Sequence, residues 1–219
     1  MSVLFKLPDF LPTNEVLWLE GNYTFVVGYN GSGKTLLLNK MSEWAESHNY
    51  SYAFYDSQTS LHLAPILMEQ ASDEDIIYIA QMIMSFSGDF KDDVLNWTKA
   101  KNGHTVEQIG PIGEDAKLLR EIFSMCGAGY SRMFTMLYLG IENQGSDYYF
   151  LDLPEASLHL HLAQAVLSIL MKNFPYTKFV ITTHSPNIIS NRWDDSSIIE
   201  MSMNVVKETT EHKWDEIFS

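Results

Sequence analysis

Residues 28–35 of the chain read GYNGSGKT, and this stretch decides the fold. It fits the pattern GxxxxGK[ST]. It lies between an apolar, strand-like run at 23–27 (YTFVV) and a helical pattern at 34–47. A strand before the loop and a helix after it make the match far more specific than the bare pattern, and they are typical of a phosphate-binding loop. Glycines let backbone N–H groups approach a phosphate closely, and the helix N-terminus adds partial positive charge.

The lysine and the threonine of this stretch have separate predicted roles. Lys34 is expected to bridge the β- and γ-phosphates of a nucleotide, and the Thr35 hydroxyl is expected to ligate Mg²⁺. A lysine at a helix start is unfavourable unless an anion binds there, which argues against a purely structural glycine turn. The predicted nucleotide-binding residues of the loop are Gly28, Asn30, Gly31, Ser32, Gly33, Lys34 and Thr35.

The other apolar runs predict the rest of a sheet. They are short and nearly continuous, which suits strands buried on both faces of a parallel sheet. They lie at 52–55, 147–151, 178–182 and 197–201. A second helical pattern covers 156–173, with apolar residues at helical spacing. Alternating strands and helices predict an α/β fold, here a P-loop NTPase with a mostly parallel sheet.

The middle of the chain has a different pattern. Residues 61–123 are mostly helical in character, and Ser72 leads an acidic first turn into the run IIYIAQMIMSF. We therefore expect one domain, 1–219, with a helical subdomain inserted at 61–130. Residues 101–114 hold Gly and Pro in turn positions and are expected to form a loop.

Length and charge limit the classes of function. The chain has 219 residues, with Asp+Glu 28 and Lys+Arg 14, so its formal net charge is −14. That balance disfavours direct nucleic-acid binding, because DNA-binding domains are typically basic. No apolar run approaches the roughly 20 residues of a membrane span, and the N-terminus does not resemble a signal peptide. With the single cysteine, Cys126, these features predict a cytoplasmic location.

Polar residues end two of the predicted strands. Asp152 follows four apolar or aromatic residues, so it is expected at the carboxyl edge of the sheet, where it would share a metal with the phosphate loop. The alternative is a helix-start aspartate ahead of Pro154. His184 ends the run FVITTH, where its Nε2 atom would reach a γ-phosphate, although a lone histidine is more often a hydrogen-bonded loop residue.

Three motifs in order, GYNGSGKT, LDLPEASLH and ITTHSP, resemble the ABC-type ATPase heads of the RecF/SMC/OLD group. The pattern of that group runs GxNGxGK[ST], then DEPE with SLHP, then TTHSP, and the resemblance covers roughly residues 3–60 and 124–200. It implies ATP and Mg²⁺ as ligands, with Lys34 and Thr35 on phosphate and metal. It also implies that Asp152 is the Walker B aspartate and that His184 is the switch histidine sensing the γ-phosphate.

The resemblance suggests two further parts of the site. Gln58 is a candidate for the glutamine that joins Mg²⁺ and the attacking water, and an ordinary exposed loop glutamine is the alternative. Residues 126–132, CGAGYSR, partly match the signature LSxGxxR, which contacts ATP on the opposite subunit. Gly127, Gly129 and Arg132 would make that contact. The alternative is a flexible glycine hinge before a helix.

One position departs from the family pattern in a way that affects catalysis. Leu153 stands where DEPE has the glutamate that polarises the attacking water, and leucine cannot orient water or accept a proton. Glu155 keeps the second glutamate of DEPE and is the nearest alternative base, unless it is a carboxylate stabilised by a helix dipole. We therefore expect ATP binding with slow hydrolysis, and we assign Lys34, Glu155 and His184 as catalytic.

The predicted assembly is a homodimer with ATP at its interface, acting on a separately encoded protein effector. ATP would close the pair, and hydrolysis or release would reopen it. Two other functions fit the motifs, a non-catalytic ATP-sensing scaffold and the nucleotide-binding subunit of a membrane transporter. A small-molecule kinase fits least, because only three arginines exist, Arg120, Arg132 and Arg192.

Overall fold

The computed structural model describes most of the chain and divides it into two compact units. The described residues are 3–6, 16–19, 21–86, 88, 90–92, 94–96, 115–125, 127–156, 158–189, 195–202 and 205–210. The predicted loop at 101–114, Cys126 and Arg192 lie outside them. The sheet unit comprises Met1–Asp56, Asn143–Ala156 and Phe174–Ser219, and the helical unit comprises Ser57–Glu142 and Ser157–Asn173.

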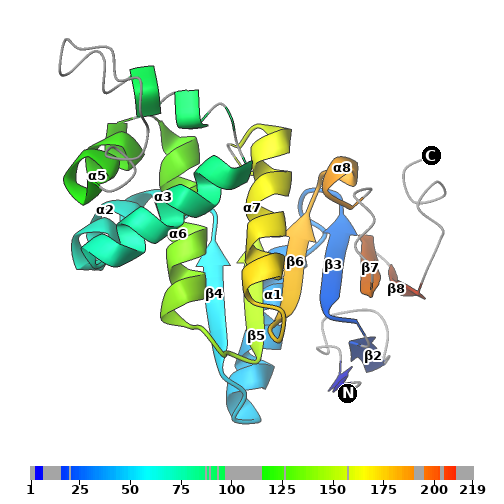
Figure 1. The fold of residues 1–219 in the computed structure, drawn as a ribbon. Coiled ribbons are helices and arrows are strands. Elements are labelled where there is room, and N and C mark those ends of the chain that lie inside the picture. The colour runs from blue at the N-terminus through cyan, green and yellow to red at the C-terminus, as the bar shows by residue number, and fades with distance from the viewer. Residues whose placement is uncertain are drawn as a thin grey trace. The chain divides into compact units, whose positions relative to one another are not determined.

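The sheet unit contains a six-stranded sheet with the order β4-β5-β6-β3-β7-β8 (Figure 1). All neighbours are parallel except β7 and β8, which are antiparallel. The strands are β3 (Tyr23–Gly28), β4 (Tyr52–Asp56), β5 (Tyr148–Asp152), β6 (Lys178–Thr183), β7 (Ser196–Ser202) and β8 (Val205–Thr210). A separate antiparallel pair joins β1 (Val3–Lys6) to β2 (Val16–Leu19). The predicted α/β fold with a mostly parallel sheet is confirmed.

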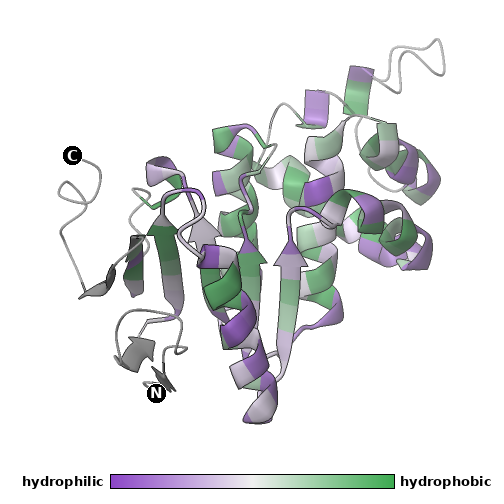
Figure 2. Ribbon diagram, turned by 180° about the vertical axis from the view of Figure 1, so that it is seen from behind, coloured by the Kyte–Doolittle hydropathy of each residue, from purple (hydrophilic) through white to green (hydrophobic). Residues whose placement is uncertain are grey.

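Helix α1 (Lys34–Ser47) packs on the sheet and holds the glycine loop in place. Its apolar side chains pack with residues of β3, β5, β6 and β7, and the strands are hydrophobic along their middle (Figure 2). The core residues from α1 are Leu37, Leu38, Met41 and Ala45, and each has at most 1% of its surface exposed. Burying each large aliphatic side chain contributes about 1.5–3 kcal/mol, so the helix start is held firmly beside the end of β3.

The helical unit contains five labelled helices in the part of the chain that the structure describes. They are α2 (Ser60–Gln70), α3 (Asp73–Phe86), α5 (Ala116–Met125), α6 (Ala128–Glu142) and α7 (Leu160–Asn173). Aromatic rings form much of its core: Phe123 lies 5.5 Å from Phe90 and 5.3 Å from Phe134 between ring centroids. The limits of this unit differ from the predicted insert at 61–130, which stays a prediction. No helix among the described residues is long and apolar enough to cross a membrane.

Two helix starts and one strand differ from the sequence-based expectations. The helix expected at 156–173 begins at Leu160, because Leu153 adopts a left-handed conformation (φ 50°) and the Ala156 N–H bonds back to its carbonyl at 2.9 Å. The resulting turn separates β5 from α7. The helix expected after the segment 126–132 begins inside that segment, at Ala128. Strand β8 was not expected, because its sequence, VVKETT, has only two apolar residues.

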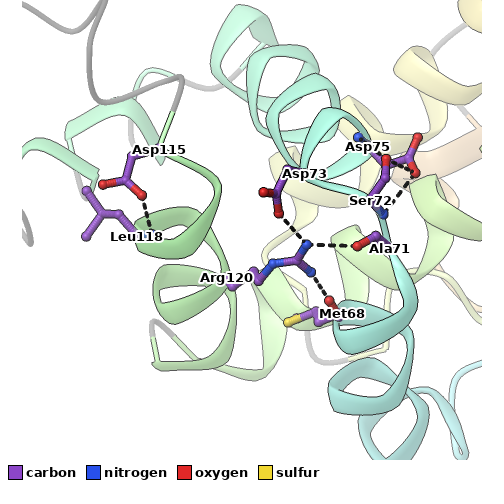
Figure 3. A network of polar contacts seen from close by, with 8 residues as sticks. All are labelled: Met68, Ala71, Ser72, Asp73, Asp75, Asp115, Leu118 and Arg120. Carbon is purple, nitrogen blue, oxygen red and sulfur yellow. Dashed lines mark hydrogen bonds and ion pairs between the residues drawn. The ribbon is translucent and has the colours of Figure 1, made fainter.

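The junction between α2 and α3 is closed by side chains at both helix ends (Figure 3). Ser72 and Asp75 cap the start of α3 reciprocally: the Ser72 hydroxyl donates to Asp75 at 2.6 Å and accepts the Asp75 N–H at 3.1 Å. At the end of α2, Arg120 donates to the carbonyls of Met68 and Ala71 and to the Asp73 carboxylate. Terminal carbonyls of a helix lack partners within it, so Arg120 supplies them.

Replacing Arg120 with alanine is expected to destabilise the helical unit by about 2 kcal/mol, because two helix-end carbonyls and one carboxylate lose a charged donor. Urea denaturation followed by circular dichroism measures the change. Arg120→Lys keeps the charge but not the forked donor geometry, so its stability should fall between that of the wild type and that of Arg120→Ala. An Arg120→Ala variant as stable as the wild type would show that the contact contributes nothing.

Candidate functional site

The glycine loop between β3 and α1 forms an open cradle of backbone. Gly31 and Gly33 have φ of 79° and 92°, the left-handed region that favours glycine. Among the described residues, no atom other than those of Gly31 and its two chain neighbours lies within 4 Å of the place where a Cβ would stand on Gly31. The Ser32 hydroxyl oxygen is buried and has no hydrogen-bond partner among the described residues. The loop thus has open space at Gly31 and, separately, a buried hydroxyl without a partner at Ser32, and an unsatisfied buried polar atom of this kind is a candidate for ligand contact.

Gly28 is required for a different reason, a close approach from another strand. A Cβ on Gly28 would lie 2.1 Å from the backbone oxygen of Met201 on β7 and 2.8 Å from the Ser32 hydroxyl oxygen. No side chain fits there, and φ at this position is 151°. The first glycine of the loop, Gly28, therefore allows β7 to pack closely against the end of β3.

Lys34 is the first residue of α1, and its side chain lies over the start of the loop. Its Nζ atom donates to the carbonyls of Gly28 at 2.8 Å and Tyr29 at 3.0 Å. An ammonium group has three donors, so these contacts hold it in place and leave one donor for a ligand. Burial lowers the pKa of Lys34, while the nearby carboxylates of Asp152 and Glu155 act in the opposite direction.

The Thr35 hydroxyl and the Asp152 carboxylate meet directly. The hydroxyl lies 3.1 Å and 3.0 Å from the two carboxylate oxygens, although the residues are 117 positions apart in sequence. Asp152 is the last residue of β5 and is 1% exposed. The Thr182 hydroxyl donates to its Oδ1 atom at 2.5 Å. A hydroxyl beside a carboxylate suits Mg²⁺ that also binds nucleotide phosphates.

The protein provides few other metal ligands in the described part of the chain, where no group of three or more His, Cys, Asp or Glu is placed to hold a metal ion. Mg²⁺ commonly takes one or two protein ligands and completes its shell with phosphates and water. The Thr35–Asp152 pair therefore fits a metal that arrives with a nucleotide, and does not fit a permanently bound structural ion.

Glu155 links the end of β5 to the segment after β6. Its Oε1 atom accepts the Thr183 hydroxyl at 2.6 Å and the His184 N–H at 2.8 Å. Its Oε2 atom is buried and has no partner among the residues described. The His184 ring places Nδ1 3.0 Å from the Gly28 carbonyl, which can only accept, so Nδ1 carries the proton in this contact. That leaves Nε2 as the ring nitrogen for a ligand.

The remaining predicted site residues belong to the helical unit. Gln58 lies in an exposed turn after β4. Gly127, with φ of 104°, precedes α6 and lines a cavity of about 320 Å³ with Met68, Met125 and Ser131. Gly129 and Arg132 lie within α6, and Arg132 is only 6% exposed. The predicted contact of Gln58 with the metal and the predicted nucleotide contacts of Gly127, Gly129 and Arg132 stay predictions.

Sequence reasoning missed the roles of Thr182 and Thr183, although both stand in the ITTHSP motif. Both are fully buried at the end of β6, and each binds a carboxylate from the end of β5. A signal was present in the sequence. Two hydroxyls that end an apolar strand must find partners when buried, and the carboxylates predicted nearby were those of Asp152 and Glu155.

The sheet order, the glycine loop and the Thr35–Asp152 pair define a fold of the P-loop class, and the solved structures similar to it include ATP-binding cassettes of ABC transporters. A nucleotide-free ATP-binding cassette from an ABC transporter matches with a TM-score of 0.58 and 13% identity, covering 99% of this chain and 94% of that chain. The ADP conformation of the cassette MJ1267 matches with a TM-score of 0.54 and 15% identity, covering 99% and 93%.

A third similar structure is the dimeric bacterial ABC transporter cassette MJ0796, with a TM-score of 0.51, 13% identity and 95% of each chain covered. No protein-family model and no curated protein matches the sequence. Likeness at this level of identity shows the fold, so the predicted P-loop NTPase fold of the ABC type is confirmed.

Proposed function

We propose that the chain is an ABC-type ATPase that binds ATP with Mg²⁺ and hydrolyses it slowly. One observation carries the proposal: a held lysine ammonium, a threonine hydroxyl and a buried carboxylate lie together at the loop between β3 and α1. The open backbone of Gly31 and the unsatisfied Ser32 hydroxyl suit phosphate oxygens. In a chain with a net charge of −14, an anion needs such a local site.

Mg²⁺ would be held by Thr35 and Asp152. When bound, the metal neutralises charge on the β- and γ-phosphates and so assists transfer to water. The Thr35 hydroxyl donates its proton to Asp152 and keeps two lone pairs on its oxygen, so it could ligate Mg²⁺ without losing that hydrogen bond. Lys34 keeps its two carbonyl contacts and directs its remaining donor at a phosphate oxygen.

Slow turnover follows from the residue after Asp152. Leu153 cannot orient the attacking water, so the proposed base is Glu155, whose Oε2 atom has no partner among the described residues. His184 would contact the γ-phosphate through Nε2. The order of the motifs LDLPEASLH and ITTHSP supports placement in the RecF/SMC/OLD group.

The proposed assembly is a homodimer closed by ATP, with Gly127, Gly129 and Arg132 facing the nucleotide of the opposite subunit and Gln58 near the metal. A dimeric cassette among the similar structures supports this arrangement. The dimer would act on a separate protein effector. A second candidate, the nucleotide-binding subunit of a membrane transporter, is favoured by the similar structures, which are transporter cassettes.

The Asp152→Asn variant tests the proposal, because it keeps the shape of the side chain and removes the metal-binding charge. We expect Mg²⁺-dependent ATP binding to weaken at least ~10-fold and phosphate release to fall roughly 100-fold. Asp147→Asn is the matched control, since Asp147 lies at the other end of β5 and binds Ser51. Calorimetric titration and a phosphate-release assay give both quantities.

Two results would contradict the proposal: a wild-type chain that does not bind ATP·Mg²⁺, or an Asp152→Asn variant that binds it as well as the wild type. The same assay on Glu155→Gln examines the base, because glutamine keeps the hydrogen-bond acceptor but takes no proton. Unchanged turnover in that variant would remove Glu155 from the chemical step. Absent turnover in the wild type, with ATP binding intact, would support the sensing scaffold.

A further inference from the structure

Two consecutive threonines at the end of β6 hold two different carboxylates. Thr182 and Thr183 are both 0% exposed. Successive side chains of a strand point to opposite faces of the sheet, so neighbouring threonines face different surroundings. Thr182 binds Asp152, and Thr183 binds Glu155. Each threonine therefore has its own partner at the candidate site.

Thr182 connects the side chain of Asp152 to the backbone that follows it. Its hydroxyl donates to Asp152 Oδ1 at 2.5 Å and accepts the Leu153 N–H at 2.9 Å. Asp152 and Thr182 are also direct partners in the parallel register of β5 and β6. Leu153 has a φ of 50°, which is unfavourable for a residue with a branched side chain. The Thr182 hydroxyl thus holds the Asp152 carboxylate in place and also stabilises the backbone of Leu153.

Thr183 fixes the segment that carries His184. Its hydroxyl donates to Glu155 Oε1 at 2.6 Å and accepts the Ser185 N–H at 3.0 Å. The same Glu155 oxygen accepts the His184 N–H at 2.8 Å. The backbone on both sides of the His184 ring is therefore tied to one threonine–glutamate pair.

We propose that Thr182 and Thr183 are separate positioning residues, Thr182 for the metal-binding carboxylate of Asp152 and Thr183 for the γ-phosphate contact of His184. The metal and the γ-phosphate named in this inference come from the proposed ATPase function, on which it rests. The competing explanation is that each hydroxyl only satisfies its own burial, in which case its loss alters stability without a selective effect on either partner.

The test compares Thr182→Val with Thr183→Val, the same isosteric change at adjacent and equally buried positions, so each variant is the control for the other. The first measurement is amide hydrogen exchange in the full chain without nucleotide. Thr182→Val should speed exchange of the Leu153 amide ~10-fold or more relative to Ser185, because that amide loses its acceptor. Thr183→Val should have the opposite effect, so that the Ser185 amide exchanges faster relative to the Leu153 amide.

The second measurement is ATP binding as a function of Mg²⁺ concentration. Thr182→Val should raise the Mg²⁺ concentration for half-saturation ~10-fold, because residues that orient metal ligands typically contribute 10–100-fold to metal affinity. Thr183→Val should leave that concentration unchanged and reduce the preference for ATP over ADP. Thr182→Ser and Thr183→Ser keep the hydroxyl and should restore each property. Thr182→Ala and Thr183→Ala allow the same comparison if a valine prevents folding.

Selective exchange at the two amides supports the inference even if the wild type fails to bind ATP, an outcome that would overturn only the proposed function. Equal acceleration of both amides in both variants, or none in either, would overturn the positioning roles. A third outcome is selective amide exchange together with the same Mg²⁺ half-saturation and the same ATP/ADP preference in both variants. That outcome would overturn the proposal that Thr182 positions the metal-binding carboxylate and that Thr183 positions the γ-phosphate contact.

Discussion

Lys34→Ala is expected to weaken ATP binding roughly 100-fold and to abolish any ATP-dependent dimer. The lysine provides an ammonium group that the carbonyls of Gly28 and Tyr29 hold at the glycine loop. Removing one partner of a buried, hydrogen-bonded charge pair typically costs 2–5 kcal/mol. Calorimetric titration with ATP·Mg²⁺ measures the affinity, and light scattering with and without ATP measures the mass in solution.

The matched control is Lys40→Ala, two turns further along α1, where the side chain pairs with Glu43 near the surface at 2.6 Å. It removes the same charge from the same helix and should leave ATP affinity unchanged. A Lys34→Ala variant that binds and dimerises like Lys40→Ala would show that nucleotide does not bind at this loop. A wild-type chain that stays monomeric with and without ATP would contradict the proposed dimer but not the proposed ATP binding.

The pKa of Lys34 adds a pH dependence to the same experiment. Burial lowers this pKa from the ordinary lysine value of 10.5. The ammonium therefore loses its proton at a lower pH than an exposed lysine does. ATP affinity should fall as the pH rises through that lowered pKa, and the fall should be absent in Lys34→Ala.

Gly28→Ala is expected to have the largest effect on folding, with a loss of more than about 4 kcal/mol or no native sheet unit at all. The added Cβ would stand 2.1 Å from the Met201 carbonyl oxygen, which belongs to the backbone of β7 and cannot rotate away. Either β7 must move from β3, or the loop must leave its present course. Urea denaturation and limited proteolysis of the full chain measure the result.

Gly31→Ala is the control, because Gly31 also has a positive φ, 79°, but has open space where the Cβ would stand. It should lose only the left-handed preference of glycine, about 1–2 kcal/mol. Equal stability of the two variants would mean that the approach of Met201 does not constrain the loop. A strong loss of ATP binding in folded Gly31→Ala would indicate that bound phosphate occupies the open space.

The sheet was predictable because its strands are buried and their sequences are continuously apolar. The runs at 23–27 and 178–182 correspond to β3 and β6 to within one residue at the strand end. Asp152 was placed at a strand end from its four preceding residues, and it is the last residue of β5. Glycine and lysine spacing likewise indicated the loop between β3 and α1.

Local turns and pairings were less predictable. Nothing in the letters DLPEAS indicates that Leu153 adopts a positive φ or that its N–H bonds to Thr182, a residue 29 positions away. The start of α7 at Leu160 follows from this turn and not from the apolar spacing of 156–173. Hydroxyl–carboxylate pairs such as Thr183–Glu155 join residues 28 positions apart, and sequence reasoning had no means to orient them.

The glycine loop occurs early in the chain, but β3 has no sheet partner until much later. Its two neighbours are β6, which begins at Lys178, and β7, which begins at Ser196. During synthesis from the N-terminus, the loop therefore emerges long before the strands that support it, and the Met201 carbonyl that approaches Gly28 comes later than all of β6. A nascent chain that has not yet reached β7 would lack the strand that approaches the loop at Gly28, so the proposed nucleotide site would form only after β7 has emerged.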